Sequence, residues 1–267
     1  MLSLSFHLTF APERRYLAAL LEYAALGKSG SMREMADDTG IPMGESTGKL
    51  PAILRYAQGM GLIEVDGNSI KRPLITDFGR VVFEEDPLLG EGLTQWLVHF
   101  NMCRGDIGAI AWHSVFAQSM LGSSFSKLQL EEYLTGVFGG KDRSGPLLVT
   151  YSDDAALARA GVLKFEDVMI LRAKAPLIRS YAVGYSAFLL TLMDAYFPSE
   201  TQVTTTDFND ASSWFDVCFW TDAEREMALT MMEETGNISI DRQMRPWIIE
   251  KRKPAAEVWP TTWADLA

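Results

Sequence analysis

The sequence contains only two cysteines, Cys103 and Cys218, and each of them lies among apolar residues. Two isolated cysteines cannot form the disulfide network that stabilises small secreted domains. No basic segment near the start precedes a long apolar stretch, and no apolar run reaches the length of a membrane span. We therefore expect a cytoplasmic protein with no signal peptide, no membrane contact and no disulfide framework.

Common signatures of nucleotide, redox and hydrolytic sites are also missing. The sequence has no GxxxxGK[ST] loop, no GxGxxG, no GxSxG and no CxxC, so ATPase, dinucleotide, serine-hydrolase and thioredoxin chemistry lack support. His99 and His113 lie in apolar segments beside Trp96 and Trp112, at a spacing that matches no metal-ligand motif. We expect hydrogen-bonded structural histidines, no metal site and no identified cofactor.

Charge is unevenly distributed along the chain. The formal net charge is −11 and the isoelectric point is near 4.8. Acidic residues dominate 199–241, whereas basic residues outnumber acidic ones in 155–182 and in 242–253. The acidic total argues against non-specific coating of nucleic acid, but binding to DNA at one place depends on a local basic patch.

Residues 1–86 show the order of elements that is typical of a winged helix-turn-helix domain. Residues 12–26 place apolar side chains at helical spacing and predict a first helix. Ser31 and Glu34 then form a capping box for a short second helix, because the hydroxyl accepts from a backbone N–H and the carboxylate reaches back.

A third helix and a hairpin complete this motif. The third helix is expected at about 47–58, and the apolar stretches 62–65 and 70–75 predict two strands. The turn between them, 66–68, contains Gly67, which accepts a positive φ without steric cost. Helix, short helix, helix and hairpin in this order predict a winged helix-turn-helix.

The rest of the chain predicts two further domains. Apolar segments in 87–140 predict a helical bundle, with Asp86 as the N-cap of its first helix. Beyond a polar linker at 141–146 we expect an α+β domain over 141–267. Within it, 160–174 repeats the helix-glycine-hairpin order and leaves open a second winged-helix-like module. The predicted fold class is mainly α with small β-hairpins (α+β).

The expected DNA contacts follow from the winged helix-turn-helix. Such a domain places the start of its third helix at base edges in the major groove and its hairpin at phosphates. Cationic side chains at these positions displace counterions from the phosphates. The residues expected to bind double-stranded DNA are Ser46, Thr47, Lys49, Arg55, Lys71 and Arg72. Three nearby acids, Asp37, Asp38 and Glu45, favour the alternative, a protein-interaction module without a DNA-binding face.

A series of short motifs resembles an uncharacterised bacterial family of winged-helix proteins encoded beside DNA phosphorothioation genes. These motifs are His7-x-Thr9-Phe10, Gly48-Lys49, Arg55-Tyr56, Gly61-Leu62-Ile63, Thr76-x-x-Gly79, Asp86-Pro87 and Trp96-Leu97-x-His99. The resemblance covers nearly the whole chain and extends to the SspB family of the single-strand phosphorothioation and phage defence system. One departure is Ser212-Ser213-Trp214-Phe215, where a Ser-Pro-Gly turn is expected.

The resemblance implies a DNA-binding subunit that presents DNA to a cysteine desulfurase and a PAPS-reductase-like phosphorothioation protein. It also implies nicking of one DNA strand, although the residues leave open whether the chain is an enzyme. His7 and Thr9 are the first residues to test for catalysis, and their alternative role is a hydrogen-bonded pair that anchors the N-terminus. A divalent cation, Mg²⁺ or Mn²⁺, is expected only if nicking occurs.

Two other functions stay open. The chain is alternatively a transcriptional regulator, with a winged helix-turn-helix that reads an operator and a C-terminal half that dimerises or senses a ligand. It is alternatively a scaffold that docks a desulfurase or sulfurtransferase through the acidic stretch 199–241. The sequence does not decide whether the chain forms a homo-oligomer.

Overall fold

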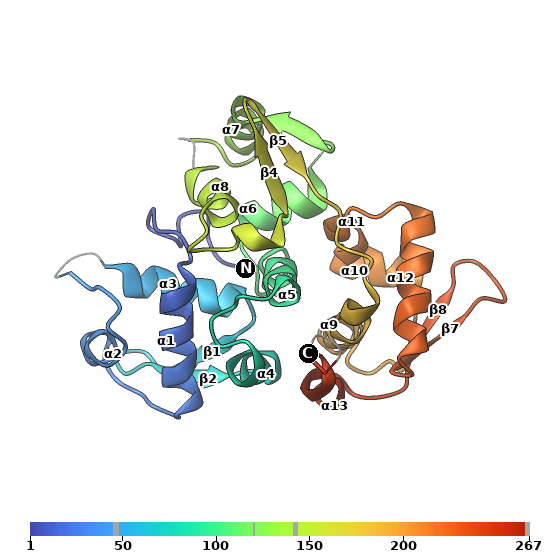
Figure 1. The fold of residues 1–267 in the computed structure, drawn as a ribbon, viewed down its shortest axis with the longest axis horizontal. Helices are drawn as coiled ribbons and strands as arrows, with labels where there is room; N and C mark the ends of the chain where they lie inside the picture. The colour runs from blue at the N-terminus through green and yellow to red at the C-terminus, as the bar shows by residue number, and fades with distance from the viewer. Residues whose placement is uncertain (45–47, 120, 141–143, 265–267) are drawn as a thin grey trace. The chain divides into compact units, whose positions relative to one another are not determined.

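The computed structural model describes residues 1–44, 48–119, 121–140 and 144–264, and it consists mainly of helices with small antiparallel sheets (Figure 1). This confirms the predicted α+β fold class. The chain divides into two compact units, Met1–Ala173 and Lys174–Ala267. The predicted domain boundaries at 86/87 and 140/141 are not tested by this division. Within the described ranges, no helix has the length and apolar character needed to cross a membrane.

The first unit opens with the predicted order of helix, short helix, helix and hairpin, followed by one further helix that was not predicted. These are α1 (Arg14–Ala25), α2 (Met32–Thr39), α3 (Lys49–Gly59), β1 (Ile63–Asp66), β2 (Arg72–Ile75) and α4 (Asp77–Glu85). Helix α1 packs against α3, β2 and α4 and buries Leu17, Leu20 and Leu21 among them (Figure 1). The capping box of α2 is confirmed, because Ser31 Oγ accepts from Glu34 N at 3.3 Å and Glu34 Oε2 accepts from Ser31 N at 2.7 Å. The winged helix-turn-helix assignment itself stays a prediction.

The hairpin has a longer loop than the sequence predicted. Strands β1 and β2 pair with Ile63 opposite Ile75 and Asp66 opposite Arg72, so the loop runs from 67 to 71 rather than from 66 to 68. Gly67 has a φ of 82°, and a Cβ added there would lie 2.1 Å from the Ile70 carbonyl oxygen. Only glycine fits this position without moving the loop.

Asp86 does not begin a helix, so that prediction was wrong. Helix α4 ends at Glu85, and the next helix, α5 (Gly92–Met102), begins beyond the intervening loop. The Asp86 carboxylate accepts from the backbone N–H groups of Gly90 and Glu91, each at 2.8 Å. Asp86 therefore stabilises the loop that leads into α5, because it pairs backbone donors that the loop leaves free.

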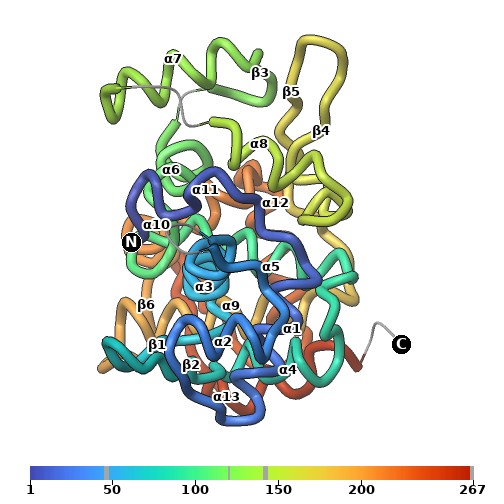
Figure 2. The backbone as a smooth tube through the Cα atoms, turned by 90° about the vertical axis from the view of Figure 1, so that its left-hand side faces the viewer, coloured from blue at the N-terminus to red at the C-terminus, as the bar shows by residue number. Residues whose placement is uncertain are grey.

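The remainder of the first unit contains a second, three-stranded sheet. Its elements are α6 (Ile110–His113), a π-helical turn (Ser114–Gln118), β3 (Ser124–Ser126), α7 (Lys127–Phe138), α8 (Ser144–Ser152), a 3₁₀ turn (Ala158–Ala160), β4 (Leu163–Glu166) and β5 (Met169–Arg172). The strand order is β3-β5-β4. Strand β3 lies in the segment 87–140, for which only helices were predicted. Figure 2 shows α7 together with the β4–β5 hairpin, away from β1 and β2.

The second unit is built around one apolar helix and a three-stranded sheet. Its elements are a 3₁₀ turn (Arg179–Tyr181), α9 (Ala182–Tyr196), β6 (Gln202–Thr204), α10 (Thr205–Ser212), α11 (Trp214–Cys218), α12 (Asp222–Glu234), β7 (Ile238–Asp241), β8 (Ile248–Lys251), α13 (Ala255–Val258) and a 3₁₀ turn (Trp259–Thr261). The sheet has the order β6-β8-β7. Helix α9 packs against α12 and α13, and its side chains Phe188, Leu189 and Leu192 are buried.

Candidate nucleic-acid interface

Helix α3 is held by its apolar face and leaves few side chains exposed. Leu50, Ile53 and Tyr56 are fully buried, whereas Arg55 is exposed. The chain enters the helix through Gly48, where an added Cβ would lie 2.7 Å from the Met43 Cα atom. The glycine of the Gly-Lys motif is thus required by a close backbone approach, and it fixes the direction in which α3 starts.

Lys49 follows this glycine and is largely removed from solvent. Its ammonium group forms an ion pair with the Glu13 carboxylate, and 18% of each side chain is exposed. The same nitrogen lies 5.6 Å from the ring centre of Phe10 and 4.9 Å from that of Tyr16, a cation–π arrangement. Its backbone N–H donates to the Pro42 carbonyl at 2.8 Å. Lys49 therefore joins α3 to the chain before α1, instead of standing free at the start of the helix.

The charge of Glu13 is stabilised by this arrangement. Burial raises the pKa of the Glu13 carboxyl, but hydrogen bonds and charges from Lys49 and Arg15 outweigh it and lower the pKa below its ordinary value. Glu13 was not anticipated as a partner of Lys49, because the two residues lie far apart in the sequence. No pattern within a single helix or strand reports such a pair.

Arg55 and the hairpin carry cations without a carboxylate partner. The Arg55 guanidinium donates to Gln58 Oε1 at 3.0 Å. The Lys71 ammonium donates to the Gly67 carbonyl at 3.0 Å, so it lies over its own loop. Arg72 is exposed on β2. Among the residues that the structure describes, none of these three forms an ion pair with an acid.

The position of the hairpin is fixed by its backbone. Lys71 exchanges two backbone hydrogen bonds with Gly30, at 3.0 and 2.8 Å, and so ties the hairpin loop to the segment that enters α2. Asp66 lies opposite Arg72 in the ladder. Its carboxylate accepts from the Gly67 N–H at 2.7 Å and forms no ion pair with Arg72. The hairpin therefore presents Lys71 and Arg72 on a backbone that is hydrogen-bonded at both sides.

Two of the predicted DNA contacts, Ser46 and Thr47, lie outside the described residues, and their role stays a prediction. The other four predicted DNA contacts have two kinds of environment. Lys49 is enclosed, whereas Arg55, Lys71 and Arg72 have no acid partner among the described residues. Arg80 on α4 shares this second environment, although the sequence did not single it out. There was little reason in the sequence to choose Arg80, because it lies beyond the hairpin in a helix that is half apolar.

His7 and Thr9 belong to a folded N-terminal segment. His7 is 4% exposed, its ring contacts the ring of Phe6 with centres 5.2 Å apart, and its Nδ1 accepts from the Thr9 N–H at 3.2 Å. Leu8 and Thr9 have φ angles of 50° and 83°, in the left-handed region. This hydrogen bond links the two residues through the Thr9 backbone, whereas the Thr9 side chain is exposed. The catalytic role of either residue is untested by this geometry.

His99 occupies a fully buried polar cluster. The Trp112 indole donates to the Tyr151 oxygen at 3.0 Å, and His99 Nδ1 lies 2.6 Å from the same oxygen. Burial lowers the pKa of His99 well below its ordinary value and so favours the neutral ring. The tautomer of that ring decides whether Nδ1 or the Tyr151 hydroxyl is the donor in their hydrogen bond. The predicted structural, hydrogen-bonded role of His99 is confirmed. His113 Nδ1 donates to the Cys103 carbonyl at 2.8 Å.

The motifs that carry the family resemblance mostly build this framework. Thr76 Oγ1 accepts from Gly79 N at 2.9 Å and donates to the Gly61 carbonyl at 2.6 Å, so it caps α4 and binds it to the hairpin. An added Cβ at Gly79 would lie 1.9 Å from the Leu62 carbonyl oxygen. Threonine and glycine at this spacing are therefore explained by packing, without reference to a ligand.

Comparisons with known proteins agree with the resemblance at the level of fold. No family model matches the chain, and no curated protein matches it. Two solved structures are similar to it, a crystal structure of SspB and a crystal structure of SspB bound to magnesium ion. The TM-scores are 0.66 and 0.65, the sequence identities 14% and 13%, and in each case the alignment covers 100% of this chain and 87% of the other. The chain thus resembles SspB in fold over its full length.

Proposed function

We propose that this chain is a DNA-binding protein of a bacterial DNA phosphorothioation system. The observation that carries the proposal is the set of cations without acid partners, Arg55, Lys71 and Arg72, on α3 and the adjoining hairpin. No acid neutralises these cations, so they can pair with phosphates. Lys49, in contrast, is paired with Glu13 and holds the start of α3 in place. The full-length likeness to SspB supports the assignment to phosphorothioation.

The proposed partners are double-stranded DNA, a cysteine desulfurase and a PAPS-reductase-like phosphorothioation protein, in the cytoplasm. The chain would position DNA for sulfur insertion by those proteins. The test is fluorescence anisotropy of a labelled duplex with the full chain, at about 50 mM and about 200 mM salt. The proposal expects binding that weakens strongly at the higher salt. An absence of binding at low salt, both alone and with the partner proteins, would refute it.

Nicking of one strand is a separate part of the proposal. One of the two SspB structures contains a magnesium ion. In the described part of this chain, no three His, Cys, Asp or Glu side chains are grouped to hold a metal. Supercoiled plasmid with Mg²⁺ or Mn²⁺ tests the activity, and His7→Ala and Thr9→Ala variants purified in parallel control for contaminating nuclease. Open-circle product that is lost in either variant would assign the cleavage to this chain and to that residue. Equal product from all three preparations would not assign the cleavage to this chain.

A transcriptional regulator remains the second candidate, because the same cations would serve an operator-binding domain. Footprinting of the chain on the DNA upstream of its own coding sequence separates the two functions. A protected site of defined sequence favours the regulator, whereas uniform protection favours the phosphorothioation role.

A further inference from the structure

Helix α3 is enclosed along most of its length. Seven of its 11 residues are buried, and Arg55 is the one that is fully exposed. A helix that lies in the major groove contacts base edges through several side chains of one exposed face. The residues of α3, Lys49–Gly59, present no such face. Contact between this helix and DNA is therefore restricted to the surroundings of Arg55.

The N-terminal segment, which precedes α1, covers α3 together with α5. The ring of Phe6 packs against that of Tyr56, with ring centres 4.8 Å apart. At Gly59, an added Cβ would lie 2.7 Å from Leu2 Cδ1 and 3.0 Å from Met102 Sδ. The glycine thus allows the N-terminal segment and α5 to pack closely against the end of α3.

A pocket of about 370 Å³ remains open between the N-terminal segment and α3. Pro51 and Arg55 line it from α3, and Ser3 and Ser5 line it from the N-terminal segment. The other residues that line it are apolar: Met1, Leu2, Phe6 and Leu8. None of the described residues around this pocket is acidic, so a bound phosphate would meet a guanidinium and no carboxylate.

The pocket also offers hydrogen-bond donors that are not in use. Ser3 and Ser5 are exposed, and neither their hydroxyls nor their backbone N–H groups form a hydrogen bond with a described residue. The Arg55 guanidinium donates to Gln58 Oε1 at 3.0 Å, and its other N–H groups remain available to a ligand. Hydroxyl and backbone donors around an arginine are the groups with which proteins contact DNA phosphates.

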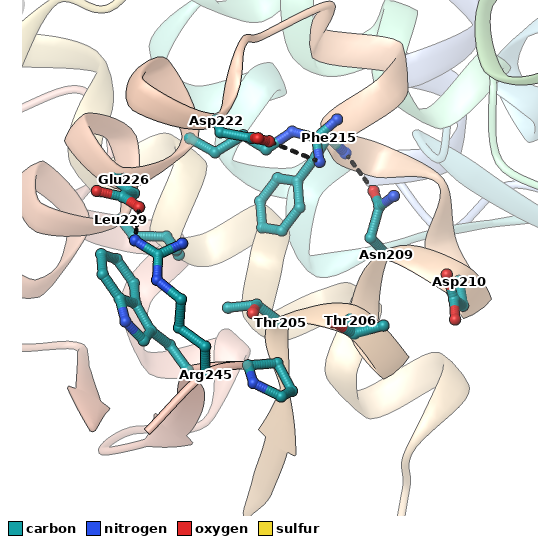
Figure 3. Close-up of a pocket in the computed structure, with 12 residues that line it drawn as sticks. Thr205, Thr206, Asn209, Asp210, Phe215, Asp222, Glu226, Leu229 and Arg245 are labelled. Carbon is teal, nitrogen blue, oxygen red and sulfur yellow. Dashed lines mark hydrogen bonds and ion pairs between the residues drawn. The ribbon is translucent and has the colours of Figure 1, made fainter. Parts of the chain in front are cut away.

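A larger cavity in the second unit lacks this property. It has a volume of about 530 Å³ and lies between α10, α11, α12 and the loop that joins β7 to β8 (Figure 3). Its two arginines are already paired, because Arg225 lies 3.1 Å from Asp216 and 3.7 Å from Asp222, and Arg245 forms an ion pair with Glu226. A phosphate there would be repelled by the carboxylates. Of these two cavities, only the pocket beside α3 suits an anion.

We propose that the pocket beside α3 holds the sugar-phosphate backbone of duplex DNA, and that the chain binds DNA without reading its sequence. Arg55, Ser3 and Ser5 donate to a phosphate, and Leu8, which is 45% exposed, lies against the deoxyribose. Contacts of this kind position DNA but carry no sequence information. The inference deepens the proposed function and rests on it, because Arg55 belongs to both.

The first test places a carboxylate in the pocket. Binding of a labelled duplex to the full chain is measured by fluorescence anisotropy at about 50 mM salt, and we expect Ser5→Asp to weaken it about five-fold, because the new charge repels the phosphate. Ser199→Asp makes the same substitution at an exposed serine that does not line the pocket, and we expect a change within about two-fold. Equal affinities of the two variants would overturn the pocket as a DNA contact. Circular dichroism melting confirms that each variant is folded.

The second test compares DNA sequences. Unlabelled duplexes of equal length and unrelated sequence, one of them taken from the DNA upstream of the coding sequence, compete with the labelled duplex, and we expect their affinities to agree within about two-fold. A preference of more than about ten-fold for one sequence would overturn the inference, because it requires base contacts. Absence of binding to any duplex would refute the proposed function and this inference with it. Equal binding by Ser5→Asp and Ser199→Asp, with binding of the unaltered chain intact, would overturn this inference alone.

Discussion

Four basic side chains of the second unit and three of the first differ in their surroundings. In the second unit, Lys174, Arg179, Arg242 and Arg245 are each paired with a glutamate of α12. In the first unit, Arg55, Lys71 and Arg72 have no acid partner among the described residues. A net charge of −11 therefore says little about where DNA could bind. What matters is which cations the fold has left unneutralised.

Lys49 stands between these two groups, because it lies on the proposed DNA-binding helix but is paired and mostly buried. Its replacement by alanine leaves the Glu13 carboxylate partly buried without its main partner. We expect Lys49→Ala to lower the free energy of unfolding by about 2 kcal/mol, measured by urea denaturation. Arg55→Ala on the same helix is the matched control, and we expect a change within about 0.5 kcal/mol. Equal effects would mean that the Glu13–Lys49 pair does not stabilise the fold.

The pH dependence of that difference tests its cause. Because the pKa of Glu13 is lower in the folded state than its ordinary value, the contribution of the pair is complete above the unfolded pKa of about 4.5 and is lost as the pH falls through the folded pKa. The destabilisation by Lys49→Ala should therefore shrink between about pH 7 and about pH 3. A destabilisation that is constant over this range would assign the effect to lost packing against Phe10 and Tyr16 instead.

The exposed pairs of the second unit should matter least. The side chains of Arg245 and Glu226 are 71% and 38% exposed, and solvent-exposed pairs contribute about 0–1 kcal/mol. We expect Arg245→Ala to change the free energy of unfolding by less than about 0.5 kcal/mol, as measured by urea denaturation. If Arg245→Ala lowered the free energy of unfolding as much as Lys49→Ala does, enclosed ion pairs would not be more stabilising than exposed ones.

The parts of the fold that depend on short sequence distances were predictable. The capping box of α2 forms as expected, and α7 and α12 begin with capping boxes of the same kind, because each requires only two residues three positions apart. Asp86 was misassigned for the same local reason: an aspartate before a proline is typical of an N-cap, but here its carboxylate reaches Gly90 and Glu91. The preference of Asp86 for the N-cap position was outweighed by the hydrogen bonds that it forms within this loop.

Features that depend on distant partners were not predictable. Strand β3 has three residues and no alternation of its own, and it exists because β5 pairs with it. The cation at position 49 was correctly placed at the start of α3, but its enclosure depends on Glu13, Phe10 and Tyr16. The same limit applies to the arginines of the second unit, since their glutamate partners are identified only once α12 and the β7–β8 loop are folded.

The most direct test of the account compares two double variants in a DNA-binding titration at several salt concentrations. Lys71→Ala with Arg72→Ala removes unpaired cations, and Arg242→Ala with Arg245→Ala removes paired ones with the same change in net charge. The account predicts that the first variant binds a duplex about ten-fold more weakly at about 100 mM salt, with the slope of log K against log[salt] reduced by about 2. It predicts a change within about two-fold for the second variant. Equal losses of affinity in the two variants, or an unchanged slope in the first, would contradict it.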